Sequence, residues 1–492
     1  MIHKLLIANR GEIACRIART CVRLAIPVAT VHSRADRDAL HVRTIGESVE
    51  IGDAPASASY LNAAAIIEAA RKTGADAIHP GIGFLSEDPS FAAAVEAAGL
   101  IFVGPRAETM RRFGDKWAAK HEARAANVPV IEGSEGSSDD AGKIEHLIRE
   151  MRLPVVLKAA AGGGGRGVRI VRTLDALRET IESAMREAKA SFGRPDLIVE
   201  SFIEKARHLE VQVAGDGEGN ALHLFERECS LQRRFQKVIE EAPAVSLSPA
   251  IREALTLDAV RLATRVAYRG VGTMEFLVSE DAYYFLECNP RLQVEHTVTE
   301  EITGVDLVEL QLRIASGEPL PFTQDAISIK GHAIQARVCA EDPAKGFLPA
   351  TGKLLTVELP GNGIRVETGV ETGSEITPHY DSMIAKLIAR GADRKEALQQ
   401  LRAAIDKTIV LGVETNLKFL ATLLAHPVVC AGQADNRFID REFASYAAAT
   451  PGLELIAIGA CLWMRHVQPE LGGDGPWTRH AKSSTTSTTS IV

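Results

Sequence analysis

Residues 274–291 have the sequence MEFLVSEDAYYFLECNPR, which predicts two β-strands joined by a polar turn around Ser279–Ala282. Glu275 and Glu287 are equidistant from residue 281, so a symmetric hairpin places them opposite each other. Directly opposed side chains lie about 5 Å apart. Two carboxylates this close repel each other, and a shared hard cation such as Mg²⁺, which prefers oxygen ligands, would remove the repulsion.

The same strand continues into two further polar residues. Strand alternation places Asn289 and Arg291 on the face of Glu287, and Pro290 suits a strand end because it has no N–H. Two carboxylates, an amide and a guanidinium on one face predict a site for a metal and a phosphate. The alternative interpretation is the solvated outer face of a sheet.

A glycine-rich loop lies upstream of this hairpin. Five glycines occupy the six residues 162–167, after the predicted strand Val155–Lys158. Because glycine has no Cβ, such a loop can bring backbone N–H groups close to phosphate oxygens, and Lys158 adds a positive charge. The loop lacks the pattern GxxxxGK[ST], so a flexible linker is the alternative. The following strand, Val168–Val171, favours a hairpin-like lid that is mobile until a ligand binds.

The first hundred residues predict a different architecture. Short apolar strands such as Leu5–Ala8 and Val28–Val31 alternate with helices such as Gly11–Leu24, which is typical of βαβ units and a parallel sheet. The turn after the first strand lacks GxGxxG and indicates dinucleotide binding only weakly. Strands dominate residues 197–300, with one helix at about Pro249–Val266, and residues 331–447 mix strands and helices.

Composition excludes several classes of protein. The 492 residues are 46% hydrophobic and 24% charged, with a net charge of −8, which argues against a nucleic-acid-binding protein. The longest apolar run near the end, Leu455–Met464, is too short to span a membrane, and the start has no room for a secretory signal. Seven cysteines without a CxxC pair indicate reduced thiols. A cytoplasmic enzyme is therefore expected.

Other charged residues are less informative by themselves. The run Glu226–Lys237, followed by Glu240-Glu241, is more typical of a salt-bridged surface. His208 and His296 have no metal-ligand spacing and favour structural roles, and Arg337 is uninformative by itself. Three cysteines near these charged residues are predicted to be buried and to act as small hydrophobic residues: Cys229, Cys288 and Cys339.

Taken together and in order, the motifs resemble the biotin carboxylase component of biotin-dependent carboxylases, an ATP-grasp enzyme. The similarity runs from Lys4 to about Phe443. It rests on the glycine loop and on these motifs: Ala8-Asn9-Arg10-Gly11-Glu12-Ile13, His79-Pro80-Gly81, Gly83-Phe84-Leu85-Ser86-Glu87, Gly114-Asp115-Lys116, Gln232-Arg233-Arg234, Gln236-Lys237 with Glu240-Glu241-Ala242-Pro243, Asn289-Pro290-Arg291-Leu292-Gln293-Val294-Glu295-His296 and Tyr380-Asp381-Ser382-Met383.

The resemblance implies an α/β and α+β protein of three domains and a tail. We expect an N-terminal Rossmann-like domain with a parallel sheet at 1–113 and an ATP-grasp domain at 114–330, with its mobile glycine-rich lid at about 131–204. A C-terminal mixed α/β domain is expected at 331–447. Residues 448–492 end in a Ser/Thr-rich run and are expected to be a disordered tail.

The reaction implied by the resemblance has two steps. MgATP phosphorylates bicarbonate to carboxyphosphate, whose carboxyl group passes to N1′ of biotin on a carrier protein or domain. Lys237, Arg291, Gln293 and Val294 would surround bicarbonate. Glu295 would be the base that removes the bicarbonate proton, and Arg337 would stabilise the biotin enolate. Phosphate and carboxylate charges gather in this reaction, and cations stabilise them.

The resemblance also assigns the nucleotide and metal ligands. Phosphates would be held by Lys116, Lys158 and the loop glycines Gly163, Gly164 and Gly165. Glu200 and the backbone near Ile203 would meet adenine, while His208, Gln232 and Leu277 would complete the nucleotide site. Glu275, Glu287 and Asn289 would bind Mg²⁺ or Mn²⁺, with two metal sites expected.

Two positions depart from the family pattern. Ile82 stands where the family usually has tyrosine, close to the biotin pocket, and Phe235 stands where it usually has histidine or asparagine, near the phosphates. ATP binding and bicarbonate activation are expected to persist. The alternatives are a catalytically impaired, nucleotide-binding paralogue within a carboxylase complex, and another ATP-grasp ligase that joins a carboxylate to an amine.

The expected partners are a biotin carboxyl carrier and a carboxyltransferase, because nothing like the acceptor motif AMKM follows Asp435–Asp440. Either both are separate proteins or the chain is a shortened form of a longer one. An acyl-CoA carboxylase of the acetyl-, propionyl- or methylcrotonyl-CoA type and an oligomer are expected.

Overall fold

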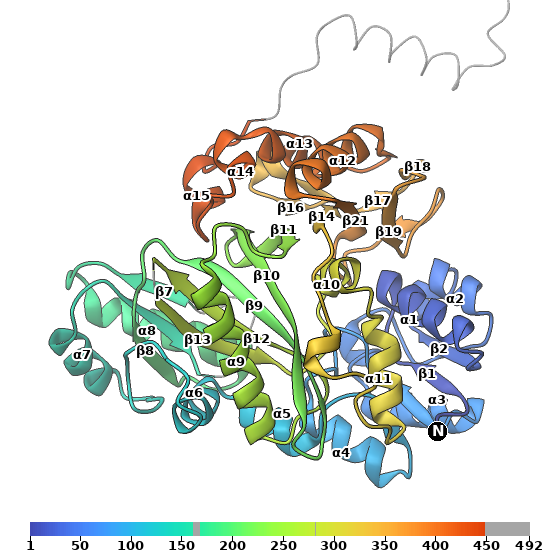
Figure 1. Cartoon of the computed structure of the whole chain (residues 1–492), viewed down its shortest axis with the longest axis horizontal. Coiled ribbons are helices and arrows are strands. Elements are labelled where there is room, and N and C mark those ends of the chain that lie inside the picture. The colour runs from blue at the N-terminus through green and yellow to red at the C-terminus, as the bar shows by residue number, and fades with distance from the viewer. Residues whose placement is uncertain (161–167, 281, 448–492) are drawn as a thin grey trace, which may run out of the picture. The chain divides into compact units, whose positions relative to one another are not determined.

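The computed structural model describes residues 1–160, 168–280 and 282–447 (Figure 1). The glycine loop at 162–167 and the tail expected at 448–492 lie outside the described residues. Residues 1–446 form one compact unit.

The N-terminal part is a five-stranded, fully parallel sheet with strand order β3-β2-β1-β4-β5. Its strands are β1 (Leu5–Ile7), β2 (Val28–His32), β3 (Ser48–Glu50), β4 (Ala77–His79) and β5 (Ile101–Phe102). Its helices are α1 (Gly11–Arg23), α2 (Leu40–Ile45), α3 (Ala63–Thr73) and α4 (Pro89–Ala97). Ile13 and Ile17, one turn apart on α1, are both buried against the sheet core, as the helical pattern predicts. The predicted parallel sheet is confirmed.

A small antiparallel sheet, β7-β6-β8, follows after three helices. The elements are α5 (Ala107–Gly114), α6 (Lys116–Ala125), α7 (Ala141–Glu150), β6 (Val155–Ala159), β7 (Val168–Val171), α8 (Leu177–Phe192) and β8 (Leu197–Ser201). Lys158 pairs with Val168, so the strands on either side of the glycine loop form the expected hairpin. The buried residues of helix α8 run from Leu177 to Ala188, while Leu174, which precedes the helix, is exposed.

The largest sheet has eight antiparallel strands in the order β13-β12-β9-β10-β11-β14-β21-β19. The strands are β9 (Arg207–Asp216), β10 (Ala221–Arg233), β11 (Gln236–Ala242), β12 (Arg269–Ser279), β13 (Ala282–Asn289), β14 (His332–Cys339), β19 (Ile364–Thr368) and β21 (Met383–Gly391). The sheet continues across the expected domain boundary at 330, because β11 pairs with β14. One sheet therefore aligns residues from both expected domains.

Helices cover this sheet at both ends (Figure 1). They are α9 (Pro249–Arg265), α10 (His296–Thr303), α11 (Leu307–Ala315), α12 (Arg394–Lys407), α13 (Leu417–Ala425), α14 (Pro427–Cys430) and α15 (Phe438–Glu442). The sequence predicts one helix within residues 197–300, which is α9, and helix α10, which begins at His296, is a second. Apolar residues of α9 pack on the face of β9 and β12 that carries Leu209, Val211 and Met274. The opposite face of these strands is left for polar residues.

Short strands complete the C-terminal part. They are β15 (Glu341–Asp342), β16 (Leu348–Pro349), β17 (Gly352–Lys353), β18 (Thr356–Glu358), β20 (Glu375–Ile376) and β22 (Ile409–Leu411). Among the helices of the described residues, none is long and apolar enough to cross a membrane. The cysteines within the described residues are all free thiols.

Candidate active site

A cavity of about 870 Å³ lies beside the polar face of the large sheet. Except for Glu200, every predicted site residue that the structure describes lines it: Lys116, Lys158, Ile203, His208, Gln232, Lys237, Glu275, Leu277, Glu287, Asn289, Arg291, Gln293, Val294, Glu295 and Arg337. These residues come from sequence segments more than 200 residues apart, and the fold brings them to one place. Gly163, Gly164 and Gly165 belong to the loop outside the described residues.

The hairpin of β12 and β13 opposes the two predicted metal ligands. Glu275 pairs directly with Glu287, which confirms the predicted opposition. The hairpin is not symmetric, however, because Phe276 pairs with Phe285 and Ser279 with Ala282. Leu286 is thus an extra residue, and this β-bulge brings Glu287 opposite Glu275.

A row of charged residues crosses four strands at this level. Arg227 of β10 pairs with Glu210 of β9, Glu210 pairs with Glu275 of β12, and Glu275 pairs with Glu287 of β13. Cross-strand partners share one face of a sheet. Arg227 is fully buried, and its Nε donates to Glu210 Oε1 at 2.6 Å. The row sets three carboxylates side by side beside the cavity.

Glu210 and Arg227 are functional-site residues that the sequence analysis missed. A clue was present in residues 208–213, where His208, Glu210 and Gln212 alternate with apolar residues. Both faces of β9 are buried, so this polar alternation marks a site and not a solvated face. The interpretation of residues 226–241 as a salt-bridged surface is wrong for Glu226 to Gln232 and for Glu240-Glu241, which are buried, whereas residues 234–236 at the turn are exposed.

Lys237 neutralises two carboxylates of the row and the nearby carboxylate of Glu295. Its Nζ lies 2.5 Å from Glu210 Oε2, 2.9 Å from Glu275 Oε1 and 2.6 Å from Glu295 Oε1. Burial raises the pKa of Glu275, but the charges of Lys237 and His208 outweigh burial and hold that pKa well below its ordinary value. Glu275 is therefore ionised and available to a cation.

Glu287 differs from Glu275 in its electrostatics. Burial, followed by the negative charge of Glu275, raises the pKa of the Glu287 carboxyl above its ordinary value. A divalent cation between the two carboxylates would reverse this effect. Asn289 belongs to the same oxygen-rich group, and its Nδ2 donates to Glu275 Oε1 at 2.9 Å.

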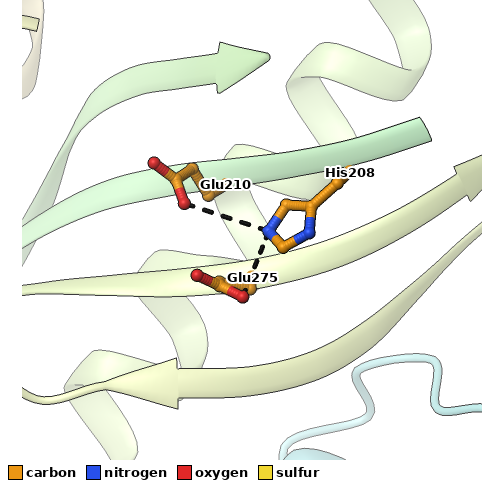
Figure 2. A group of neighbouring side chains, drawn as sticks. All are labelled: His208, Glu210 and Glu275. Carbon is orange, nitrogen blue, oxygen red and sulfur yellow. Dashed lines mark ion pairs between the residues drawn. The ribbon is translucent and has the colours of Figure 1, made fainter. Parts of the chain in front are cut away.

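His208 also faces the carboxylate row, as Figure 2 shows. Its Nε2 lies 3.1 Å from Glu275 Oε2 and 4.0 Å from Glu210 Oε2. Burial lowers the pKa of the imidazole, but Glu275 outweighs burial and the net pKa is raised. His208, Glu210 and Glu275 lie close enough to share a metal ion.

Arg291 and Glu295 flank the row from the segment that follows β13. Arg291 donates from Nη2 to Asn289 Oδ1 at 3.0 Å and lies 2.8 Å from Glu87 of the N-terminal part. Glu295 accepts from Lys237 and, at 3.0 Å, from Nη2 of Arg337. Although burial raises the pKa of Glu295, these two cations lower it far below its ordinary value.

Glu200 is the one described candidate that does not line the cavity. Its carboxylate lies 2.5 Å from Lys120 Nζ and 2.6 Å from Lys158 Nζ, off the wall of the cavity. Burial raises the pKa of Glu200, but the two lysines outweigh it and lower that pKa to about 2. Strand β8 pairs with β6, which brings Glu200 close to Lys158. The ion pair between them orients the Lys158 side chain.

The two departures from the family pattern both line the cavity. Ile82 belongs to a loop in which the backbone carbonyls of Pro80 and Ile82 accept hydrogen bonds from Asn9 Nδ2. Phe235 is 46% exposed and occupies a two-residue turn in which Arg233 pairs with Gln236. Cys229 and Cys288 are buried as predicted, whereas Cys339 is half-buried on the cavity wall.

The antiparallel sheet with its carboxylate hairpin, the smaller sheet that carries Lys158, and the cavity beside them define an ATP-grasp ligase. Residues 115–323 match the family described as "Carbamoyl-phosphate synthase L chain, ATP binding domain". Residues 1–110 and 335–441 match the N-terminal and C-terminal domains of biotin carboxylase. The chain belongs to the biotin carboxylase family.

Individual relatives agree with this assignment. Biotin carboxylase of Pseudomonas aeruginosa is 47% identical over 444 residues, which cover 90% of this chain and 99% of the relative. The alpha subunit of mitochondrial methylcrotonoyl-CoA carboxylase of Glycine max is 49% identical over 442 residues. The match covers 89% of this chain and 60% of that subunit, so the chain spans about 60% of the length of such relatives.

Solved structures give the same fold. The biotin carboxylase domain dimer of the Hydrogenobacter thermophilus 2-oxoglutarate carboxylase, in complex with MgADP, ADP and bicarbonate, has a TM-score of 0.88 and 41% identity. The match covers 92% of this chain and all of that domain. Biotin carboxylase of Campylobacter jejuni, in a beta-gamma-ATP complex, has a TM-score of 0.87 and 41% identity, with 90% of this chain and 99% of that chain covered.

Proposed function

We propose that this chain uses ATP and bicarbonate to carboxylate biotin on a carrier. The observation that supports this most strongly is the set of residues that line the cavity of about 870 Å³. Oxygen ligands for a divalent cation, Glu275, Glu287 and Asn289, line the same cavity as the bicarbonate-binding candidates Lys237 and Arg291. Such a cavity can hold a metal-bound triphosphate next to a small anion.

The nucleotide would occupy the part of the cavity nearest the small sheet. Lys116 and Lys158 would contact the phosphates, together with the loop glycines Gly163, Gly164 and Gly165. Lys158 is oriented by the Glu200 carboxylate, so its charge is fixed before the nucleotide arrives. The base and ribose would be contacted by Ile203, His208, Gln232 and Leu277.

The donor set fits Mg²⁺ or Mn²⁺. Hard divalent cations prefer carboxylate and amide oxygens, and the buried Glu275–Glu287 pair has a repulsion that a cation would relieve. Glu275, Glu287 and Asn289 would hold the metal, and two ions remain our expectation. A bound metal supplies charge neutralisation for the phosphates.

Bicarbonate would lie between Arg291, Lys237, Gln293 and the backbone at Val294. Glu295 accepts the O–H proton of bicarbonate, whose freed oxygen attacks the γ-phosphorus as the bond to ADP breaks. The product is carboxyphosphate. Its carboxyl group then passes to N1′ of biotin as the bond to phosphate breaks, the leaving phosphate takes the N1′ proton, and Arg337 stabilises the enolate form of the ureido group. Each cation faces a charge that grows during the reaction.

We further propose a place for the chain in an acyl-CoA carboxylase of the methylcrotonyl-CoA type. The 49% identity to a methylcrotonoyl-CoA carboxylase alpha subunit supports this acceptor over the acetyl- and propionyl-CoA alternatives. A biotin carboxyl carrier and a carboxyltransferase would be its partners. The Hydrogenobacter relative described as a dimer supports an oligomer. A cytoplasmic location, as expected from the sequence, completes the proposal.

Phosphate release from the purified chain tests the activity. With MgATP, we expect slow release that rises when bicarbonate and free biotin are both added. No release despite retained ATP binding would favour the impaired paralogue. Stimulation by another carboxylate, and not by bicarbonate, would favour a different ATP-grasp ligase.

Phe235→His is expected to raise kcat/KM for bicarbonate-dependent ATP hydrolysis about tenfold. A histidine nitrogen could donate to a phosphate, and charge-assisted hydrogen bonds of this kind contribute about 1.5 kcal/mol or more. Phe235 has φ +66°, a region that histidine enters more readily than most residues. Phe235→Leu, which adds no donor, is the control and should match the wild type. Equal rates for all three proteins would show that the position is tolerant.

A further inference from the structure

Glu240 is a buried carboxylate to which the proposed mechanism gives no role. It lies on β11, pairs with Gln335 of β14, and is fully buried. Both of its oxygens are occupied: Oε1 accepts from Arg337 Nε at 2.6 Å and Oε2 accepts from Gln335 Nε2 at 3.0 Å. Thr297 of helix α10 donates to Gln335 Oε1, which fixes the amide that holds Glu240.

A bulge in β11 brings this carboxylate to the active site. Leu231 pairs with Ile239 but Gln232 pairs with Lys237, so Val238 is an extra residue. Without the bulge, Lys237 and Glu240 would face opposite sides, because side chains alternate along a strand. With it, both contact the same small group of charges around Glu295.

Arg337 is shared between two carboxylates. Its Nη2 contacts Glu240 and also donates to Glu295 Oε2 at 3.0 Å. The guanidinium is thus fixed on one side by a group that never meets substrate and on the other by the proposed base. If Glu240 carried no charge, Arg337 could turn fully onto Glu295, away from the position that an incoming ureido oxygen needs.

We propose that Glu240 is a positioning residue that holds Arg337 for the transfer of the carboxyl group to biotin. This inference rests on the proposed biotin carboxylase function. Small displacements of a positioned catalytic group lower rates steeply, by about a hundredfold for about 1 Å. The effect should be confined to the step that uses Arg337, while ATP binding, which involves other residues, is spared.

Glu240→Gln tests the proposal in the full-length chain, with phosphate release measured against free biotin and against MgATP. We expect kcat/KM for biotin to fall about tenfold to a hundredfold, with the KM for MgATP within about twofold of the wild type. In an Arg337→Met background, the same substitution should change the residual rate little, because both residues act through one interaction. If Glu240→Gln does not fold, Gln335→Leu, which frees one Glu240 oxygen, should lower the same parameter less.

Glu241→Gln is the matched control. Glu241 is the next residue, is also buried, and pairs with His332 and Arg394 on the opposite face of β11. The Glu241→Gln variant should lose stability as Glu240→Gln does, but its biotin-stimulated phosphate release should match the wild type. The proposal would be overturned if Glu240→Gln kept the wild-type kcat/KM for biotin. It would also be overturned if Glu240→Gln lowered this parameter as much in the Arg337→Met background as in the wild type. A wild-type chain without biotin-stimulated phosphate release would instead contradict the proposed function itself.

Discussion

Glu287→Gln is expected to lower the Mg²⁺-dependent, bicarbonate-stimulated release of phosphate about a thousandfold. Removing one preorganised electrostatic contact to a transition state costs about 10²–10³ in rate, and this change removes a charged oxygen ligand from the metal site. The same variant should bind Mg²⁺ more weakly in a calorimetric titration with a nonhydrolysable ATP analogue. Rates that match the wild type would show that Glu287 does not hold the metal.

Although Glu287→Gln should lower activity, it should preserve or raise the stability of the folded protein. The pKa of Glu287 is raised by burial and by Glu275, so the folded protein is most stable when this group is protonated and loses stability as pH rises through that pKa. Glutamine remains neutral at every pH. Without metal at neutral pH, Glu287→Gln should therefore unfold at the same or a higher temperature than the wild type.

Glu280→Gln is a suitable control for this prediction. Glu280 belongs to the same hairpin and loses the same charge, but it is exposed at the end of β12 and does not line the cavity. It should leave metal binding and activity unchanged. Loss of activity in both variants would point to damage of the hairpin and not to a lost ligand.

Local sequence patterns predicted the parts of the site that lie within one hairpin. Glu275 and Glu287 are twelve residues apart, and strand periodicity is sufficient to oppose them. The bulge at Leu286 could not be predicted, because nothing in the alternation distinguishes a bulged hairpin from a symmetric one. The opposition was therefore predicted correctly from a symmetry that the hairpin does not have.

Residues brought together by distant strands were harder to predict. Glu210 lies opposite Glu275 because β9 is the neighbour of β12, and Arg227 lies opposite Glu210 because β10 is the next strand, and this strand order is not written in any single segment. Arg337 and His208 appeared uninformative until the family resemblance was considered. The ion pairs of Glu200 with Lys120 and Lys158 were not predicted either, because these residues also come from separate segments.

Lys237→Met is expected to destabilise the fold by about 3–5 kcal/mol at neutral pH, the range for breaking a buried ion pair, and to abolish activity. Lys237 lies within 2.9 Å of three carboxylates, those of Glu210, Glu275 and Glu295. Methionine fills a similar volume but removes the cation that contacts all three carboxylates, which increases their mutual repulsion. Thermal unfolding measures the stability, and biotin-stimulated phosphate release measures the activity.

The pH dependence of unfolding gives this prediction its sharpest test. In the wild type, the pKa values of Glu275 and Glu295 lie below their ordinary values, so both groups stabilise the fold above about pH 4.5 and lose this effect as pH falls. In Lys237→Met, the loss of this charge should raise both pKa values, although His208 still faces Glu275 and Arg337 still contacts Glu295. The stability that these groups contribute should then change less between acid and neutral pH, so stability rises less steeply with pH than in the wild type. Lys345→Met, at a surface pair with Asp342, should keep the wild-type slope, and an unchanged slope in Lys237→Met would mean that Lys237 does not neutralise these carboxylates.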